Sequence, residues 1–267
     1  MKIHLNGEFG YELLYGLPLI NHLKEQGEDI EIFAPKGSKW LYPNMNVNEV
    51  FNQRIPFMQL EIDGEIYYRQ HHHIGDLWNT PFHETNWSPP DLKSHYKEQY
   101  KIRMEKPLLI VSNKYQVEWG EAPVNYISEE CLRGIFELTK DKFTVVYNRP
   151  GNSDITLDNS PQMTLNDYSL CRELGIYTIQ DFMNDWGMDY NETQIALYAN
   201  CDHFVSTQGG NSAYAAYFGG VNTIFGIRGS EITSNAYSTF FPKLSNQTIY
   251  HETTYDGVIK RVESYVK

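Results

Sequence analysis

The sequence lacks long apolar runs, paired cysteine motifs and a basic N-terminal leader. No window approaches the roughly 18–20 apolar residues of a membrane-spanning helix, so we expect no stable membrane insertion. The first ten residues contain one lysine and no apolar segment, which argues against a signal peptide. The three cysteines are scattered without a CxxC pair, which excludes a disulfide scaffold or zinc knuckle and favours a reducing, cytoplasmic compartment.

Positive charge is also scarce. Acidic residues outnumber basic ones by 34 to 22, and the formal net charge is -12, which disfavours nucleic acid as a partner. Hydrophobic residues make up 41% of the 267 residues, enough for the cores of two small domains. Aromatic residues make up 14%; they can stack on sugars or bases, although core packing is the commoner use of any one tyrosine.

The chain opens with a strand, a helix and a second strand. Residues 2–6 and 30–35 are predicted strands, and the apolar positions of residues 11–27 repeat with a helical period. We expect Gly27 to end this helix and Pro18 to kink or break it.

A second α/β unit follows the same order. Its predicted strands are residues 107–114 and 143–150, and the helix between them, residues 128–141, has Ser128 as its N-cap. Strand–helix–strand twice over indicates parallel α/β units with right-handed crossovers.

Less regular sequence connects the two units. Residues 58–70 predict a β-hairpin that turns at Asp63-Gly64. A loop rich in His, Trp and Pro follows, and residues 91–104 predict a helix. We therefore divide the chain into an N-terminal domain, residues 1–104, and a C-terminal domain, residues 105–267.

The second half continues as a doubly wound pattern, which binds ligands beyond the C-terminal ends of its strands. The predicted elements are a short strand and turn over 177–186, a helix over 190–201 with Asn191 as a possible cap, a strand over 202–207, a turn over 208–211, a helix over 212–220, a strand over 221–226 and a last helix over 254–266.

The turn Gln208–Asn211 joins a strand to a helix of small residues through two glycines. The backbone N–H groups of Gly210, Asn211 and Ser212, helped by the Ser212 hydroxyl, would then face a phosphate at the helix N-terminus. An ordinary tight turn that packs the helix closely on the sheet explains the same residues. The stretch is neither a GxGxxG nor a P-loop motif.

Residues 201–226 resemble the donor-site segment of GT-B glycosyltransferases such as heptosyltransferases and O-fucosyltransferases. The shared order is an acidic residue, a strand, a Ser/Thr–Gly turn, a helix of small residues, a glycine and a strand. Residues 6–14, NGEFGYELL, resemble the glycine loop that opens their N-terminal domain. The resemblance implies two Rossmann-like units facing across a cleft, with a trimmed N-terminal unit on the acceptor side and a nucleotide sugar in the C-terminal unit.

The resemblance also implies roles for single residues on the donor side. Lys114 would meet the donor phosphates, or is a solvated lysine; Arg149 would bind phosphate, or pairs with an acidic neighbour. Glu231 would accept from ribose hydroxyls, or is an acid at a helix start. The full donor-binding set is Lys114, Arg149, Thr207, Gln208, Gly209, Gly210, Asn211, Ser212 and Glu231.

Transfer with inversion needs a base for the acceptor proton. Glu8 is the first candidate because it follows a strand and faces the expected cleft, and Glu12 and Asp76 are the others. The acceptor side would include Phe9, Gly10 and His73.

A metal is not expected. Of the three consecutive histidines 71–73, only the first and third share a face of a strand, and no acidic or cysteine partner has a recognisable spacing. The DxD motif of metal-dependent GT-A enzymes is absent. No cofactor is expected beyond the nucleotide sugar, which is a substrate.

The sequence therefore predicts a metal-independent glycosyltransferase that moves a sugar from a nucleotide-sugar donor to a glycan or another hydroxyl acceptor. A non-catalytic module that binds nucleotide or carbohydrate is the alternative, since a fold does not establish chemistry. A sugar-nucleotide epimerase is disfavoured because the GxxGxxG spacing and a Tyr-x-x-x-Lys pair are both absent.

Overall fold

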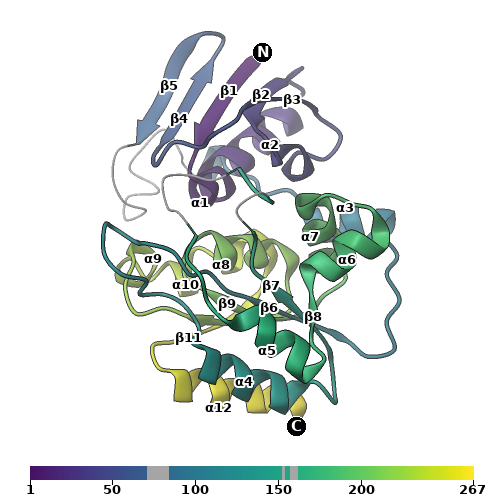
Figure 1. The fold of residues 1–267 in the computed structure, drawn as a ribbon. Helices are drawn as coiled ribbons and strands as arrows, with labels where there is room; N and C mark the ends of the chain where they lie inside the picture. Colours follow the sequence, from purple (N-terminus) through teal and green to yellow (C-terminus); the bar gives the residue numbers. More distant parts are fainter. Residues whose placement is uncertain (71–83, 152–153, 157–161) are drawn as a thin grey trace.

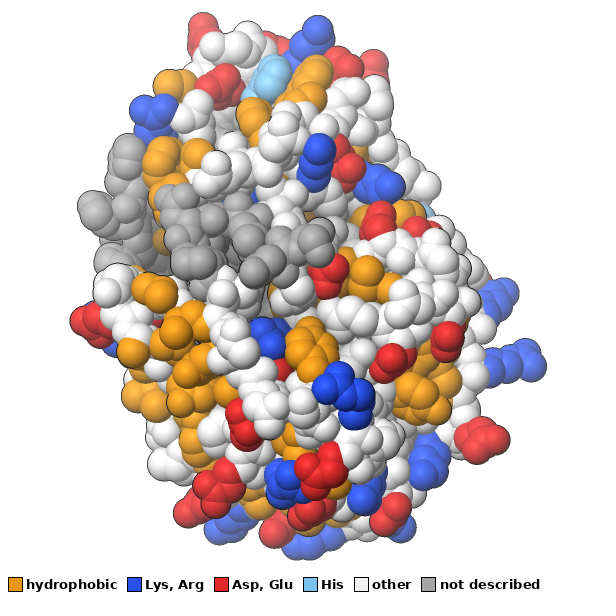
Figure 2. Space-filling model, viewed as in Figure 1, with side chains coloured by type: hydrophobic (Ala, Val, Ile, Leu, Met, Phe, Trp, Pro, Cys, Tyr) orange, Lys and Arg blue, Asp and Glu red, His pale blue; other side chains and the backbone are white. Residues whose placement is uncertain are grey.

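Two β-sheets, one from each half of the chain, lie one above the other with helices between and below them (Figure 1). The computed structural model describes residues 1–70, 84–151, 154–156 and 162–267. Within those ranges no helix is both long enough and apolar enough to cross a bilayer. On the face shown in Figure 2, acidic and basic side chains are interspersed over the surface of the lower half.

The first sheet has the order β3-β2-β1-β4-β5. β1, β2 and β3 run parallel, whereas β4 and β5 form the predicted antiparallel hairpin beside β1. Asp63 and Gly64 both have positive φ, 50° and 89°, as a two-residue type I′ turn requires. The strands are β1 (Lys2–Gly7), β2 (Glu31–Pro35), β3 (Asn46–Phe51), β4 (Met58–Ile62) and β5 (Glu65–Gln70). The sequence analysis did not predict β3.

The first helix is interrupted where Pro18 lies, as expected. It consists of α1 (Phe9–Tyr11), a π-helical turn (Glu12–Gly16) and α2 (Leu17–Glu25). Proline has no N–H to donate, and the wider turn just before it accommodates the missing hydrogen bond. Gly27 ends α2 with φ 89°; its N–H donates to the carbonyl of Lys24 at 2.9 Å.

Glu12, in the π-helical turn, is fully buried. Its carboxylate accepts from Arg54 Nη1 at 2.6 Å, from the Tyr42 hydroxyl at 2.9 Å and from the Ser38 hydroxyl at 3.1 Å. Arg54 Nη1 also donates to the carbonyl of Gly7 at 3.0 Å. Glu12 therefore anchors the helix to the loops after β2 and β3, and it has no accessible oxygen with which to act as the acceptor's base.

The second sheet has six strands, all parallel to their neighbours, in the order β11-β10-β9-β6-β7-β8. This is the doubly wound arrangement, with β6 and β9 adjacent where the direction of winding reverses. The strands are β6 (Leu108–Ser112), β7 (Thr144–Asn148), β8 (Tyr177–Thr178), β9 (His203–Thr207), β10 (Val221–Phe225) and β11 (Thr248–Glu252). β11 was not predicted.

The helices lie on both faces of this sheet: α4 and α12 below it, α8 above it and facing the first half (Figure 1). The helices are α3 (Leu92–Gln99), α4 (Glu129–Thr139), α5 (Asp167–Leu174), α6 (Ile179–Trp186), α7 (Tyr190–Ala199), α8 (Gly210–Ala215), α9 (Ser230–Thr233), α10 (Ala236–Thr239), α11 (Pro242–Ser245) and α12 (Tyr255–Val266).

The predicted N-cap residue is the observed cap in one helix and not in another. Ser128 caps α4 as predicted, with its hydroxyl accepting from the Cys131 N–H at 3.3 Å. Asn191 is not the cap of α7, because that role belongs to Asp189. The predicted turn within residues 177–186 is the helix α6, which a reciprocal capping box between Thr178 and Asp181 begins.

One core joins the two halves. It continues from the first sheet through α1 and α2 to α7, α8 and one face of the second sheet. At its centre Tyr217 is fully buried and its hydroxyl donates to the carbonyl of Leu13 at 2.5 Å. A second core lies between the other face of the second sheet and the helices α4, α5 and α12.

The helix α3, which ends the first half of the chain, packs against α7 of the second half. Just after α3, the Tyr100 hydroxyl donates to Glu192 at 2.9 Å. The domain boundary between residues 104 and 105 stays a prediction.

We predict that the thiols of the folded protein do not react. Cys131, Cys171 and Cys201 are buried and unpaired, and burial raises the pKa of each thiol to about 12. The reactive thiolate is therefore scarce at pH 8. Ellman's reagent should detect none of the three in the native protein and all three in guanidinium chloride. A fast native reaction of even one thiol would contradict this packing.

We also predict that removing Arg54 alone destabilises the protein more than removing both charges of the Arg54–Glu12 pair. Arg54→Met leaves a charged carboxylate buried without its cation and should lower the free energy of unfolding by about 3–5 kcal/mol. The double variant Glu12→Gln/Arg54→Met removes both charges and should recover part of that loss. Urea denaturation measures all three proteins; a double variant less stable than Arg54→Met would refute the explanation.

Candidate functional site

Lys114 and the glycine turn meet at the point where the winding of the second sheet reverses. Lys114 is the second residue after β6, and Gly209 is the second residue after the adjacent strand β9. The ammonium of Lys114 lies 3.3 Å from Gln208 Oε1. Gly209 has φ 100°, and a Cβ at this residue would stand 3.4 Å from Lys114 Nζ. The ammonium of Lys114 therefore lies close to the backbone of the turn.

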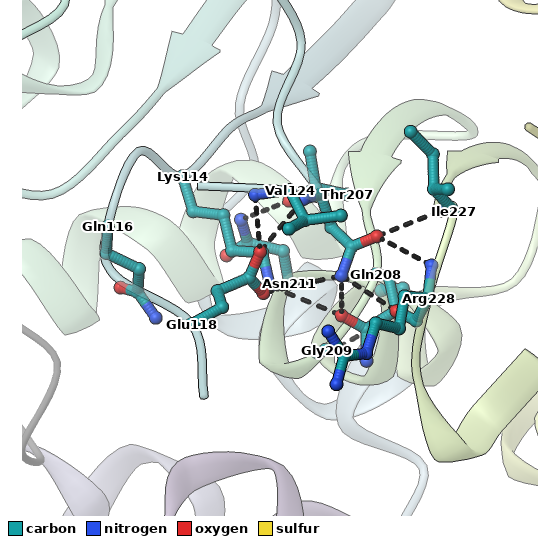
Figure 3. Close-up of polar contacts among 12 residues, drawn as sticks. Lys114, Gln116, Glu118, Val124, Thr207, Gln208, Gly209, Asn211, Ile227 and Arg228 are labelled. Carbon is teal, nitrogen blue, oxygen red and sulfur yellow. Dashed lines mark hydrogen bonds and ion pairs between the residues drawn. The ribbon is translucent and has the colours of Figure 1, made fainter. Parts of the chain in front are cut away.

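Glu118 holds the Lys114 ammonium in an ion pair (Figure 3). Its second oxygen accepts the backbone N–H groups of Val124 at 3.2 Å and Asn125 at 2.8 Å. Burial raises the pKa of the Glu118 carboxyl, but Lys114 and these N–H groups outweigh it, so the pKa lies below its usual value. Glu118 is consequently charged at neutral pH and balances the charge of Lys114.

Gln208 connects this pair to Glu231. Its Oε1 accepts from Lys114 and from Asn125 Nδ2, the latter at 2.9 Å, and its Nε2 donates to Glu231 Oε2 at 2.5 Å. Asn125 Oδ1 in turn accepts the N–H groups of Ile227 and Arg228 at 2.8 and 3.1 Å (Figure 3). The loops after β6, β9 and β10 are thus joined by one hydrogen-bond network.

The turn itself differs from the expected phosphate cradle in two respects. The Ser212 hydroxyl donates to the carbonyl of Gly209 at 2.9 Å, so it stabilises the turn. The predicted nine-residue helix is only six residues long, Gly210–Ala215, and continues as a short 3₁₀ turn, so its dipole is weaker than expected. Asn211 Nδ2 donates to Thr207 Oγ1 and to the carbonyl of Asn113, both at 3.2 Å.

The N-terminal loop reaches the same turn. A Cβ at Gly10 would stand 3.9 Å from the Cα of Gly210, and a Cβ at Gly210 would stand 3.1 Å from Phe9 Cδ1. Glu8, half-buried, is the residue before α1 and its carbonyl accepts the N–H groups of Tyr11 and Glu12. The expected acceptor-side residues Phe9 and Gly10 therefore contact the expected donor turn.

Arg149 takes the second of the two roles considered for it. Its guanidinium forms a buried ion pair with Asp167, with Nη2 donating to Oδ1 at 2.8 Å. Asp167 also accepts from the Tyr147 hydroxyl at 2.5 Å, and Tyr147 accepts from Asn113 Nδ2 at 3.2 Å. Arg149 thus stabilises the end of β7, and its guanidinium is already paired.

Two predicted residues, Asp76 and His73, lie outside the described residues, as do the other two consecutive histidines. In the described ranges, no three His, Cys, Asp or Glu side chains come together as metal ligands would. Three residues of this network, Asn113, Glu118 and Asn125, were not predicted from the sequence. Asn113 and Glu118 carried a local signal, because they stand one residue before and four after Lys114. Asn125 carried none, since its partners are as far away as Arg228.

Comparison with solved structures finds matches that include two heptosyltransferases, each aligned over nearly the whole of both chains. The ADP-heptose LPS heptosyltransferase II of E. coli matches with a TM-score of 0.57 and 12% identity over 98% of this chain and 97% of that one. The E. coli heptosyltransferase WaaC, solved with ADP, matches with a TM-score of 0.51 and 10% identity over 98% of this chain and 96% of that one. No protein-family model matches, and neither does any curated protein sequence. At these identities the likeness shows the fold: the chain has the two-sheet α/β architecture of the heptosyltransferases, as its two glycine loops predicted.

Proposed function

We propose that the protein is a glycosyltransferase that takes a sugar from a nucleotide-sugar donor and transfers it to a hydroxyl of a glycan or another acceptor. The observation that carries the proposal is the position of Lys114. Its ammonium lies against the Gly209 backbone, where β6 and β9 end side by side, and in this proposal it holds the phosphates of a leaving nucleotide. The fold shared with two heptosyltransferases supports the same class of reaction.

In this proposal a cationic side chain handles the leaving charge and no metal takes part. An incoming phosphate competes with Glu118 for the Lys114 ammonium, because the two are paired in the ligand-free protein. Glu8, on the loop that contacts the turn, serves as general base, and transfer proceeds with inversion. The competing function is a binding module that holds the nucleotide or carbohydrate without transfer. The observation in its favour is that Arg149 is already paired with Asp167 and Lys114 with Glu118, which leaves neither cation unpaired for a leaving phosphate.

Donor binding should depend on Lys114. Because Lys114→Met alone would leave Glu118 unpaired, the comparison is between Glu118→Gln, which keeps the lysine, and Lys114→Met/Glu118→Gln, which lacks it. A hydrogen bond to a charged group contributes about 1.5–3 kcal/mol, so the double variant should bind nucleoside diphosphate about 10–100-fold more weakly. Calorimetry with ADP, GDP and UDP, after a thermal-shift panel of nucleotide sugars, measures the difference.

Lys142→Met is the matched control, because Lys142 is an exposed lysine in the turn before β7, at the N-terminal end of that strand and thus opposite the C-terminal strand ends near Lys114. It should bind nucleotide like the parent. Equal affinities of Glu118→Gln and the double variant would place the phosphates elsewhere.

Turnover should depend on Glu8. A general base contributes about 10²–10⁴-fold to the rate, so Glu8→Gln should lower kcat for transfer by that factor. Donor affinity should be unchanged, since the substitution keeps the size of the side chain. Release of nucleoside diphosphate in the presence of acceptor measures kcat. Parent-like turnover would assign the base to another residue, and nucleotide binding without any turnover in the parent would favour the binding module.

A further inference from the structure

The turn at residues 118–121 holds a tryptophan in a conformation that its side chain disfavours. The N–H of Glu121 donates to the carbonyl of Glu118 at 2.9 Å, and the two central residues, Trp119 and Gly120, have φ 52° and 76°. Two positive φ values indicate a type I′ turn, which prefers Asn-Gly because a bulky side chain at positive φ is strained. Asparagine at position 119 would therefore serve the turn better than tryptophan does.

The strained tryptophan is also exposed to solvent. Trp119 is 50% exposed, and Ile227, in the loop after β10, is 55% exposed. The Ile227 side chain extends away from the hydrogen-bond network that holds its backbone (Figure 3). One exposed apolar side chain is ordinary, but two on neighbouring loops, with strain accepted to display one of them, indicate a contact surface.

Arg228 and Glu121 bring opposite charges to the same place. The guanidinium of Arg228 lies 4.9 Å from the centre of the Trp119 ring, and its Nη1 donates to Glu121 at 2.9 Å. The side chains of Arg228 and Glu121 are 55% and 61% exposed, so a partner can reach both. Tryptophan and arginine are enriched among the residues that contribute most to protein interfaces. We call Trp119, Glu121, Ile227 and Arg228 the tryptophan patch.

The backbone beneath the tryptophan patch is fixed in place. Asn125 Oδ1 accepts the N–H groups of Ile227 and Arg228, and Asn125 Nδ2 donates to the carbonyl of Arg228 at 2.8 Å. Glu118, at the start of the turn, is held by Lys114 and by two backbone N–H groups. Neither loop has to become ordered on binding, which lowers the entropic cost of an association.

The charges of the tryptophan patch favour a second copy of the chain as its occupant. With one exposed acid and one exposed base, the patch is complementary to itself, as a twofold contact requires. Two chains with a net charge of -12 repel each other, and this repulsion is weakest where the local charges cancel.

We propose that two copies of this chain form a reversible twofold dimer through the tryptophan patch. In this dimer Arg228 pairs with the partner's Glu121, and Trp119 packs on the partner's Ile227. The area is small, so the dimer is a transient one. The inference does not depend on the proposed function, in which none of the four residues has a role.

Trp119→Asn separates an interface role from a role in the fold. The turn gains its preferred residue, which offsets the lost stacking on Arg228, so the variant should keep the stability of the parent in urea. Its dimer dissociation constant should rise at least about 30-fold, as for an interface hot spot. Sedimentation velocity from about 1 µM to about 500 µM protein measures this constant. Tyr177→Asn is the matched control, since Tyr177, on β8, is an aromatic residue of similar exposure, 52%; it should dimerise like the parent.

A mixing experiment tests the charge contact and does not depend on the tryptophan variant. Glu121→Arg and Arg228→Glu each place two like charges within one chain and across their own twofold contact, so each alone should be monomeric. A mixture of the two variants opposes two arginines to two glutamates across the contact and should form a heterodimer. Pairing within one chain cannot explain that rescue, because both chains keep their like charges.

The outcomes decide as follows. A parent dimer, a folded monomeric Trp119→Asn and a heterodimer only in the mixture support the proposal. A parent that sediments as a monomer at every concentration overturns it, even if Trp119→Asn then proves to weaken nucleotide binding, because the patch would be part of a ligand site. Parent-like dimerisation of Trp119→Asn, equal loss in Tyr177→Asn, or a monomeric mixture also overturns it.

Discussion

The approach of two glycines, Gly10 and Gly210, determines how the halves of this molecule meet. A Cβ at Gly210 would stand 3.1 Å from the ring of Phe9, and a Cβ at Gly10 would just touch Gly210, so each loop packs on the backbone of the other. Tyr217, about two helical turns after Gly210, extends the contact by donating a hydrogen bond to the carbonyl of Leu13. The loop before α1 and the turn after β9 are therefore parts of one contact, so a ligand held by one would lie near the other.

The charges around this contact are balanced within the chain. Arg54 pairs with Glu12, Arg149 with Asp167 and Lys114 with Glu118. The first two pairs are buried on both sides, where breaking a pair costs more than a ligand contact returns. Lys114 is the least buried of the three cations, with 15% of its side chain exposed, and it lies against the glycine turn. An anion that bound Lys114 would have to compete with Glu118 for the ammonium.

Local patterns were sufficient to predict most of the fold. Apolar runs and periods gave the central strands and the long helices, and Asp63-Gly64 gave the hairpin. The edge strands β3 and β11 were missed because long-range pairing, which local sequence does not show, holds them in the sheet. The same distinction holds for the candidate site. Lys114 and the glycine turn could be predicted because each follows the end of a strand, whereas Asn125 could not, because only folding brings Gln208 and Arg228 to it.

Gln208 is the side chain whose orientation has the widest consequences. Lys114 and Asn125 donate to its Oε1, and the acceptor Glu231 takes a hydrogen from its Nε2, so a flipped amide would face donors with a donor and an acceptor with an acceptor. The amide therefore has one stable orientation. In that orientation its Nε2 fixes one oxygen of the buried Glu231 carboxylate. Gln208, the first residue after β9, consequently connects the Lys114–Glu118 pair to Glu231.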